Sequence, residues 1–150
     1  MRPTRFLVIA ATLSVVAGLA LAVPVGAGTA ASCNGLPVTV DLNFGGVPTA
    51  GDDVILGTPG ADIIDALAGN DNICAGSGDD IVDGGPGNDT IFGEFGADSI
   101  TGSDGNDSID GGGDADIIEG NAGFDTLNGG DADAMIDGDN GTAVVTGKNG

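Results

Sequence analysis

The most regular feature of the sequence is an aliphatic residue that recurs every nine positions. From Pro48 to Thr146 the chain divides into eleven consecutive nonamers without insertion or deletion. The eighth position is aliphatic in all of them, at Ile55, Ile64, Ile73, Val82, Ile91, Ile100, Ile109, Ile118, Leu127, Ile136 and Val145. One apolar position in nine fits neither an amphipathic helix nor a long alternating strand. The pattern predicts a three-residue strand whose middle side chain points into a core.

The polar positions of the nonamer are just as regular. Gly occupies the fourth position in nine of the eleven nonamers, and the six residues before each strand predict a turn, because glycine accepts positive φ. One turn reverses the chain and the next returns it, so two nonamers make one coil of eighteen residues. The predicted fold is therefore all-β, a parallel β-roll or β-solenoid of eleven repeats, with coils about 4.8 Å apart.

Aspartate marks the end of nearly every turn. The sixth position is Asp in nine nonamers, at Asp53, Asp62, Asp71, Asp80, Asp89, Asp98, Asp107, Asp116 and Asp125. In a stack of coils these residues form two ladders, one on each edge. Two unit charges 5 Å apart repel by roughly 3 kcal/mol at an effective dielectric constant of 20. We therefore expect a cation between successive rungs, which makes about seven sites, and all-oxygen ligands in a flexible loop favour Ca²⁺.

The nonamers resemble the hemolysin-type (RTX) calcium-binding repeat family, whose consensus is G-G-x-G-x-D-x-U-x with U a large aliphatic residue. The fifth nonamer, GGPGNDTIF from Gly84 to Phe92, matches that consensus fully. The resemblance implies a right-handed parallel β-roll with Ca²⁺ between its turns, held by the nine aspartates named above. The last two nonamers depart from it, with Ala134 and Ala143 at the sixth position. They are expected to form a metal-free cap unless Asp131 or Asp133 substitutes locally.

The N-terminal segment has the pattern of a secretory signal. Arg2 and Arg5 precede an apolar run from Phe6 to Val23, and small residues follow Pro24. An uncleaved membrane anchor is the alternative, because eighteen apolar residues nearly span a bilayer. We expect residues 1–31 to be the signal peptide, 32–47 an N-terminal cap, 48–128 the calcium-binding β-roll, and 129–150 degenerate repeats with a C-terminal cap.

Export affects the two cysteines. Cys33 and Cys74 are the only cysteines, and an even pair outside the cytosol usually forms a disulfide. Two free thiols are the alternative. Lipidation of Cys33 is disfavoured, because Ala30 replaces the large aliphatic residue expected three positions earlier.

Charge and composition narrow the function. The chain has 23 acidic residues, three basic residues and no histidine, and only Lys148 remains basic after signal removal, for a net charge of −22. Such a charge argues against nucleic acid and anionic membranes as partners, because both require basic patches. The lack of histidine excludes a Ser or Cys triad. We expect a secreted, extracellular, non-catalytic calcium-binding protein whose protein or glycan partner is unknown. The alternatives are an ice-binding or adhesive solenoid and, less favoured, an enzyme acting on polysaccharide.

Overall fold

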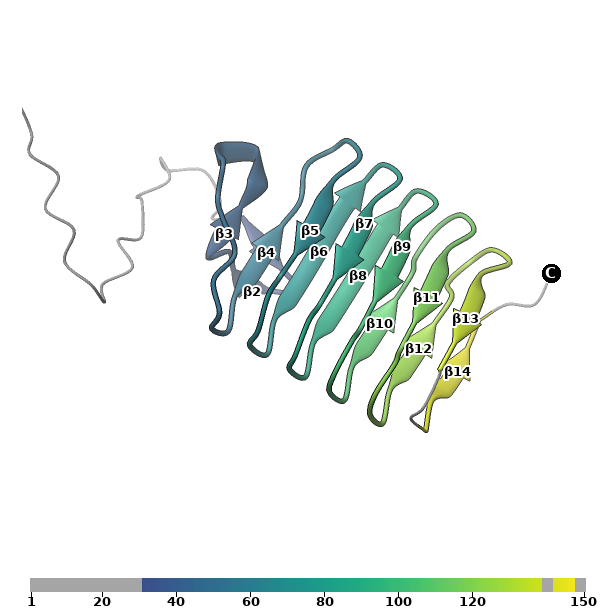
Figure 1. Ribbon diagram of the computed structural model, residues 1–150. Coiled ribbons are helices and arrows are strands. Elements are labelled where there is room, and N and C mark those ends of the chain that lie inside the picture. The colour runs from purple at the N-terminus through teal and green to yellow at the C-terminus, as the bar shows by residue number, and fades with distance from the viewer. Residues whose placement is uncertain (1–30, 139–141, 148–150) are drawn as a thin grey trace, which may run out of the picture.

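The described part of the chain consists of strands and turns with one short 3₁₀ helix, as Figure 1 shows. The computed structural model describes residues 31–138 and 142–147. The expected signal peptide lies outside the described residues, except for Ala31. Within the described ranges, no helix combines the length and the hydropathy that crossing a membrane requires.

Each nonamer contributes one strand, and its eighth residue is always part of that strand. The strands are β4 (Val54–Leu56), β5 (Ile63–Asp65), β6 (Asn72–Ser77), β7 (Ile81–Asp83), β8 (Thr90–Phe95), β9 (Ser99–Thr101), β10 (Ser108–Asp110), β11 (Ile117–Glu119), β12 (Thr126–Asn128), β13 (Met135–Asp137) and β14 (Val144–Thr146). Strands β6 and β8 are longer than the expected three residues, because their ladder runs on into the turn, where Gly76 pairs with Glu94.

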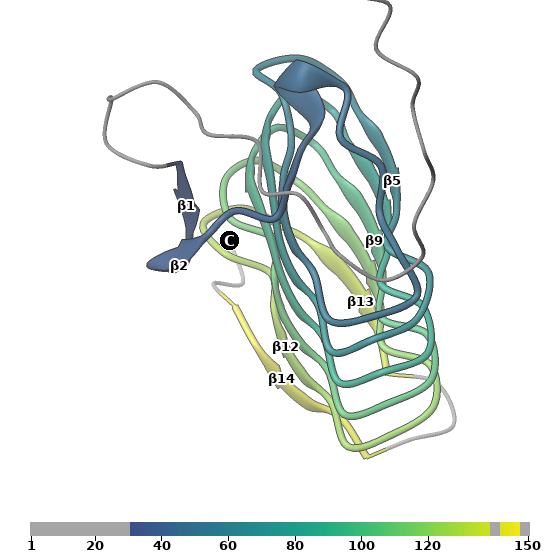
Figure 2. The same cartoon turned by 90° about the vertical axis from the view of Figure 1, so that its left-hand side faces the viewer.

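Alternate strands pair in parallel, so the chain completes one coil every eighteen residues. Ile55 lies opposite Ile73, and Ile64 lies opposite Val82. The pairing produces a seven-stranded sheet in the order β14-β12-β10-β8-β6-β4-β3 and a five-stranded sheet in the order β13-β11-β9-β7-β5. Seen along the stack, the coils superimpose as a flattened ring with one sheet on each side (Figure 2). The predicted β-roll with two repeats per coil is confirmed.

The core is a double column of the eighth-position side chains. The nine from Ile55 to Leu127 are between 0% and 2% exposed. Burial of one such aliphatic side chain contributes about 1.5–3 kcal/mol. The core is therefore only one side chain wide per strand, and its stability depends on how well the coils stack.

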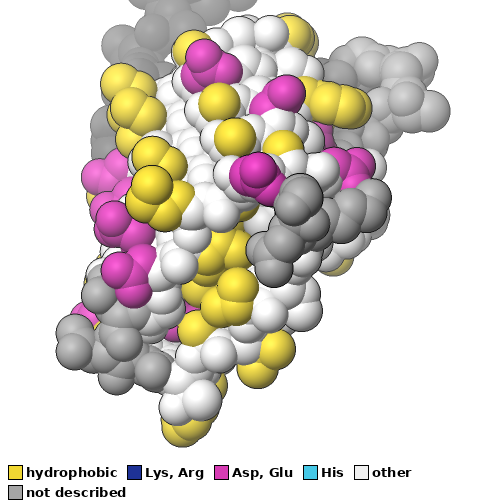
Figure 3. All heavy atoms as spheres, turned by 90° about the vertical axis from the view of Figure 1, so that its right-hand side faces the viewer, with side chains coloured by type: hydrophobic (Ala, Val, Ile, Leu, Met, Phe, Trp, Pro, Cys, Tyr) yellow, Lys and Arg dark blue, Asp and Glu magenta, His cyan; other side chains and the backbone are white. Residues whose placement is uncertain are grey.

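The last coil at the C-terminal end of the stack is less buried than the others. Ile136 is half-buried and Val145 is 54% exposed, because no further coil among the described residues covers them. Ala134, Ile136 and Val145 line a shallow hollow there, and Figure 3 shows apolar side chains in the middle of this end. Strands β13 and β14 nevertheless continue the two sheets, so the last two repeats keep the fold. That they form a metal-free cap stays a prediction.

The N-terminal end is covered by a small cap. Strands β1 (Ser32–Cys33) and β2 (Leu36–Pro37) form an antiparallel hairpin beside the stack. Strand β3 (Val40–Asp41) then adds in parallel to β4, and the helix η1 (Leu42–Phe44) follows it. Val40, only 4% exposed, pairs with Ile55 and so covers the first rung of the core.

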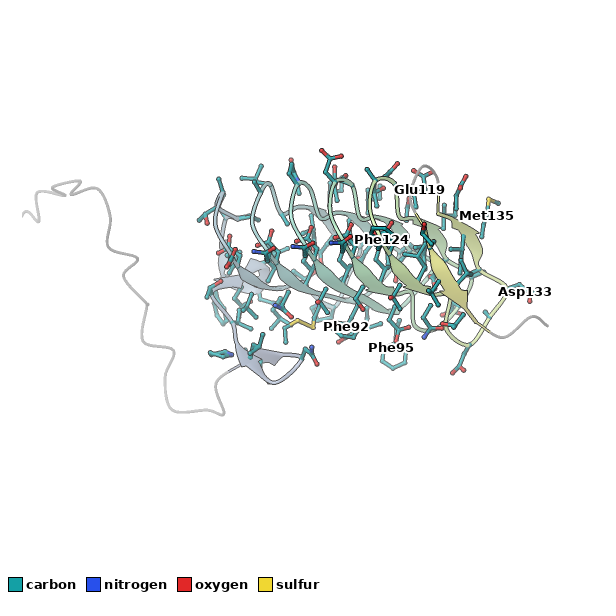
Figure 4. All side chains as sticks on the ribbon, turned by 90° about the horizontal axis from the view of Figure 1, so that it is seen from below. Phe92, Phe95, Glu119, Phe124, Asp133 and Met135 are labelled. Carbon is teal, nitrogen blue, oxygen red and sulfur yellow. A yellow bond between two sulfur atoms is a disulfide. The ribbon has the colours of Figure 1, made fainter. Side chains whose placement is uncertain are left out.

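The hairpin is tied to the stack by a disulfide between Cys33 and Cys74, whose Cα atoms lie 5.7 Å apart. The predicted pairing is confirmed, and Figure 4 shows this bond between the hairpin and the seven-stranded sheet. Replacing both cysteines by serine is expected to lower the free energy of unfolding by about 4 kcal/mol, because the bond closes a loop of 41 residues in the unfolded chain. Denaturant unfolding in saturating Ca²⁺ measures the loss. A change below about 1 kcal/mol would contradict the expectation.

Candidate metal centre

The sixth-position aspartates lie where each turn meets its strand. The carbonyl oxygen of Asp71 accepts a hydrogen bond from Thr90 N–H at 2.8 Å, and that of Asp89 accepts one from Ser108 N–H at the same distance. These bonds continue the sheet ladder by one residue and fix the aspartate backbone. Eight of the nine aspartates are buried, and Asp62 is half-buried. Two columns of carboxylates therefore lie inside the edges of the stack.

Successive aspartates of each column are in direct contact. The N–H of every aspartate except the last of each column donates to Oδ1 of the aspartate one coil later, at 2.7 to 3.0 Å. One ladder contains Asp53, Asp71, Asp89, Asp107 and Asp125, and the other contains Asp62, Asp80, Asp98 and Asp116. The structure thus brings the predicted ligands together in the two predicted columns.

The second carboxylate oxygen of most of these residues has no hydrogen-bond partner among the described residues. The buried Oδ2 atoms without a partner are those of Asp71, Asp80, Asp89, Asp98, Asp107, Asp116 and Asp125. Buried polar atoms are nearly always hydrogen-bonded, and burial of an unpaired charge is costly. Seven such oxygens in two regular columns therefore indicate places for a bound cation.

Glycine keeps the space open beside five of the seven unpaired oxygens, and Ala66 and Ala75 hold the corresponding position in the repeats of Asp71 and Asp80. A Cβ atom added to Gly84 would come within 2.5 Å of Asp89 Oδ2 and 3.1 Å of the Gly102 carbonyl oxygen. One coil later, a Cβ on Gly102 would meet Asp107 Oδ2 at 2.5 Å and the Gly120 carbonyl oxygen at 3.0 Å. The first residue of the repeat therefore lies between a carboxylate oxygen of its own repeat and a backbone carbonyl oxygen of the next coil. Its side chain must be small.

Burial also changes the acidity of the ladders. It raises the pKa of Asp89, Asp98 and Asp107 from 3.8 to about 6. The hydrogen bond from a backbone N–H lowers each pKa, and the charges of neighbouring aspartates in the same ladder raise it. The pKa values of Asp71, Asp80 and Asp116 are raised for the same leading reason. Without a cation, the folded ladders thus resist full ionisation.

The donor set fits a hard cation. Within residues 31–138 and 142–147, no group of three or more His, Cys, Asp or Glu side chains converges on one point. A cation between two rungs would therefore complete its shell with backbone carbonyl oxygens of the turns. Ca²⁺ takes six to eight oxygen ligands in irregular geometry, and Mg²⁺ requires a stricter octahedron. The oxygen donors of the aspartate ladders therefore fit Ca²⁺ better than Mg²⁺.

Asp53 and Asp62 differ from the other seven aspartates. Thr49 N–H donates to Asp53 Oδ2 at 2.7 Å, and Thr58 N–H donates to Asp62 Oδ2 at 2.6 Å. The corresponding oxygen is therefore satisfied within the protein in the first two repeats. That all nine aspartates bind Ca²⁺ stays a prediction.

Sequence reasoning missed a third ladder, formed by asparagines at the fifth position. Asn88 N–H donates to Asn70 Oδ1 at 3.0 Å, and Asn106 N–H donates to Asn88 Oδ1 at 2.9 Å. The signal was present, because Asn recurs at this position in three alternate nonamers. These uncharged contacts support the turns on one edge of the stack and need no metal.

The outer faces of the sheets bear on the ice-binding alternative, which requires a regular threonine array. The seventh-position row of the seven-stranded sheet contains Val54, Asn72, Thr90, Ser108, Thr126 and Val144. On the five-stranded sheet the row is Ile63, Ile81, Ser99, Ile117 and Met135. Figure 4 shows Met135 and Glu119 on the side opposite Phe92 and Phe95. Neither row is a threonine array.

Comparison with known families agrees with this geometry. The family described as RTX calcium-binding nonapeptide repeat (4 copies) matches residues 48–82, 83–118 and 110–145. These ranges cover the repeats found from periodicity, including most of the last two. No curated protein and no solved structure matches the chain.

Proposed function

The chain belongs to the RTX calcium-binding nonapeptide repeat family, and from this premise we propose that it is a secreted, non-catalytic protein whose β-roll is folded by about seven extracellular Ca²⁺ ions. The observation that carries the proposal is the set of seven buried Oδ2 atoms without a partner. Their number equals the count of gaps between rungs that the sequence pattern predicts.

Electrostatics explains why the ions would be needed. The stretch from Asp41 to Asp139 contains every acidic residue of the chain and no basic one. Seven Ca²⁺ ions would reduce a net charge of −22 to about −8, which a small soluble protein tolerates. Each ion would bind the unpaired oxygen of one rung, together with turn carbonyls, and would replace repulsion between rungs by attraction. Metal-binding free energy then becomes folding free energy.

Secretion and lack of catalysis rest on separate features. The Cys33–Cys74 disulfide favours an oxidising compartment outside the cytosol, and RTX repeat proteins are typically secreted. The chain has no histidine, and most of its buried carboxylates belong to the ladders. Calcium ions are therefore the partners that we propose, and the strongly negative charge argues against nucleic acid.

Counting bound ions tests the proposal. The double variant Asp89→Asn and Asp107→Asn is expected to bind about two fewer Ca²⁺ ions than the wild type, because each substitution removes one charged ligand between coils. Equilibrium dialysis with metal analysis, supported by calorimetry, gives the count. Asp104→Asn with Glu119→Gln is the matched control, because it removes the same charge from two exposed residues of the same region. The proposal fails if the ladder variant binds as many ions as the wild type, or if the wild type holds only one weakly bound ion.

A further inference from the structure

We infer that the first coil of the stack is metal-free, and that Asp53 and Asp62 hold its two turns by hydrogen bonds instead of binding Ca²⁺. The inference rests on the proposed function and refines it. The ions then begin at Asp71 on one edge and at Asp80 on the other. Two observations support this assignment: the contacts of the two carboxylates and the backbone conformation of their turns.

Both carboxylate oxygens of Asp53 accept hydrogen bonds, from its own turn or from the N-terminal cap. Its Oδ2 accepts from Thr49 N–H at 2.7 Å and from Thr49 Oγ1 at 3.0 Å. Its Oδ1 accepts from Thr39 Oγ1 at 3.2 Å, and Thr39 belongs to the N-terminal cap. A cation at this carboxylate would have to displace donors that already satisfy both oxygens.

Asp62 repeats the arrangement on the other edge. Its Oδ2 accepts from Thr58 N–H at 2.6 Å and from Thr58 Oγ1 at 3.0 Å. The same hydroxyl lies 3.1 Å from Asp62 Oδ1. The atom that is unpaired and buried in the next seven aspartates is therefore doubly hydrogen-bonded in both turns of the first coil.

The backbone of these two turns differs from that of the later ones. From the third to the tenth nonamer, the second residue has positive φ, even at Leu67 (76°), Glu94 (70°) and Asn121 (66°). Thr49 and Thr58 occupy this position in the first two nonamers and are not among the residues with positive φ. Positive φ is energetically unfavourable for residues other than glycine, so the surrounding structure must hold the later turns in this left-handed backbone conformation.

The two conformations direct the amide of the second residue differently. In the first coil that amide points back to the carboxylate of its own turn, where it donates to Oδ2. In the later turns the same oxygen has no donor. The first coil can therefore form without metal, between the N-terminal cap on one side and the disulfide-linked strand β6 on the other. The calcium-dependent coils can then stack on the edge of this metal-free first coil.

Two double variants, one coil apart, separate this assignment from a ladder of nine equal ligands. Asp53→Asn with Asp62→Asn is expected to bind as many Ca²⁺ ions as the wild type. Asp71→Asn with Asp80→Asn, the same chemical change on the same two edges, is expected to bind about two fewer. Equilibrium dialysis in excess Ca²⁺ followed by metal analysis gives both numbers.

The outcomes are distinguishable. Equal losses in the two variants would overturn the inference and leave the proposed function intact. No loss in either variant would overturn the proposed function itself. If the first variant does not fold, Thr49→Val with Thr58→Val replaces it, because it removes the hydroxyl donors and leaves the carboxylates. That variant is expected to keep the wild-type ion count with a lower thermal midpoint, and fewer ions would overturn the inference.

Discussion

Removal of Ca²⁺ from the folded protein lacking residues 1–31 is expected to abolish most of its far-ultraviolet β signal. The core is one aliphatic side chain wide per strand, and seven buried carboxylate oxygens have no partner in the part of the chain that the structure describes. Ordering of glycine-rich turns is entropically costly, and the stretch that must order has no basic residue. Circular dichroism after dialysis against a chelator measures the loss.

Return of Ca²⁺ is expected to restore the signal, with saturation between sub-millimolar and millimolar concentrations, the range of extracellular calcium modules. Mg²⁺ at the same concentration is the control and is expected to restore little, because it requires octahedral geometry and keeps its waters. A spectrum that does not respond to the chelator would rule out calcium-dependent folding. It would also show that the stacked aliphatics and the asparagine ladder are sufficient for the fold.

Acidification is expected to act in opposite directions with and without Ca²⁺. Burial raises the pKa of Asp89, Asp98 and Asp107 to about 6, against an ordinary value of 3.8. Between these two values the folded, metal-free ladders bind more protons than the unfolded chain does. Stability of the metal-free protein therefore falls as pH rises through this window, and grows as pH is lowered from 7 towards 4. Three further aspartates are shifted in the same direction, so the effects add.

With Ca²⁺ bound, stability is expected to fall, and not to rise, as the pH is lowered. The ligands must be deprotonated, so Ca²⁺ affinity is expected to fall as pH drops through about 6. Thermal unfolding from pH 7 to pH 4 measures both effects, with a chelator in one series and Ca²⁺ in the other. The metal-free protein is expected to gain β signal on acidification, and the calcium-loaded protein is expected to lose thermal stability. If stability changed with pH in the same direction in both series, the assignment of the ladders as the calcium ligands would be contradicted.

The repeat pattern predicted most of the architecture. A strict nine-residue period fixes which side chain points inward, because each coil must place its eighth residue above that of the coil before. The pairing of Ile55 with Ile73 and of Ile73 with Ile91 follows directly from that period. The two aspartate columns follow for the same reason. The disulfide was predictable only as a pairing, since two cysteines in an oxidising compartment have one intramolecular partner each.

The repeat period was therefore enough to predict the fold, the core column and the two edges that carry the aspartates. The tertiary structure decided the state of each carboxylate, because that state depends on the turn backbone and on the neighbouring coils. Asp53 and Asp89 hold the same position in the repeat, yet Thr49 and Thr39 satisfy Asp53, and Oδ2 of Asp89 has no donor. Exposure at the ends was decided in the same way, since Val145 has the pattern of a core residue but no coil of the described residues stacks on it. The periodicity of the sequence predicts the features that all repeats share, and the contacts between coils decide how individual repeats differ.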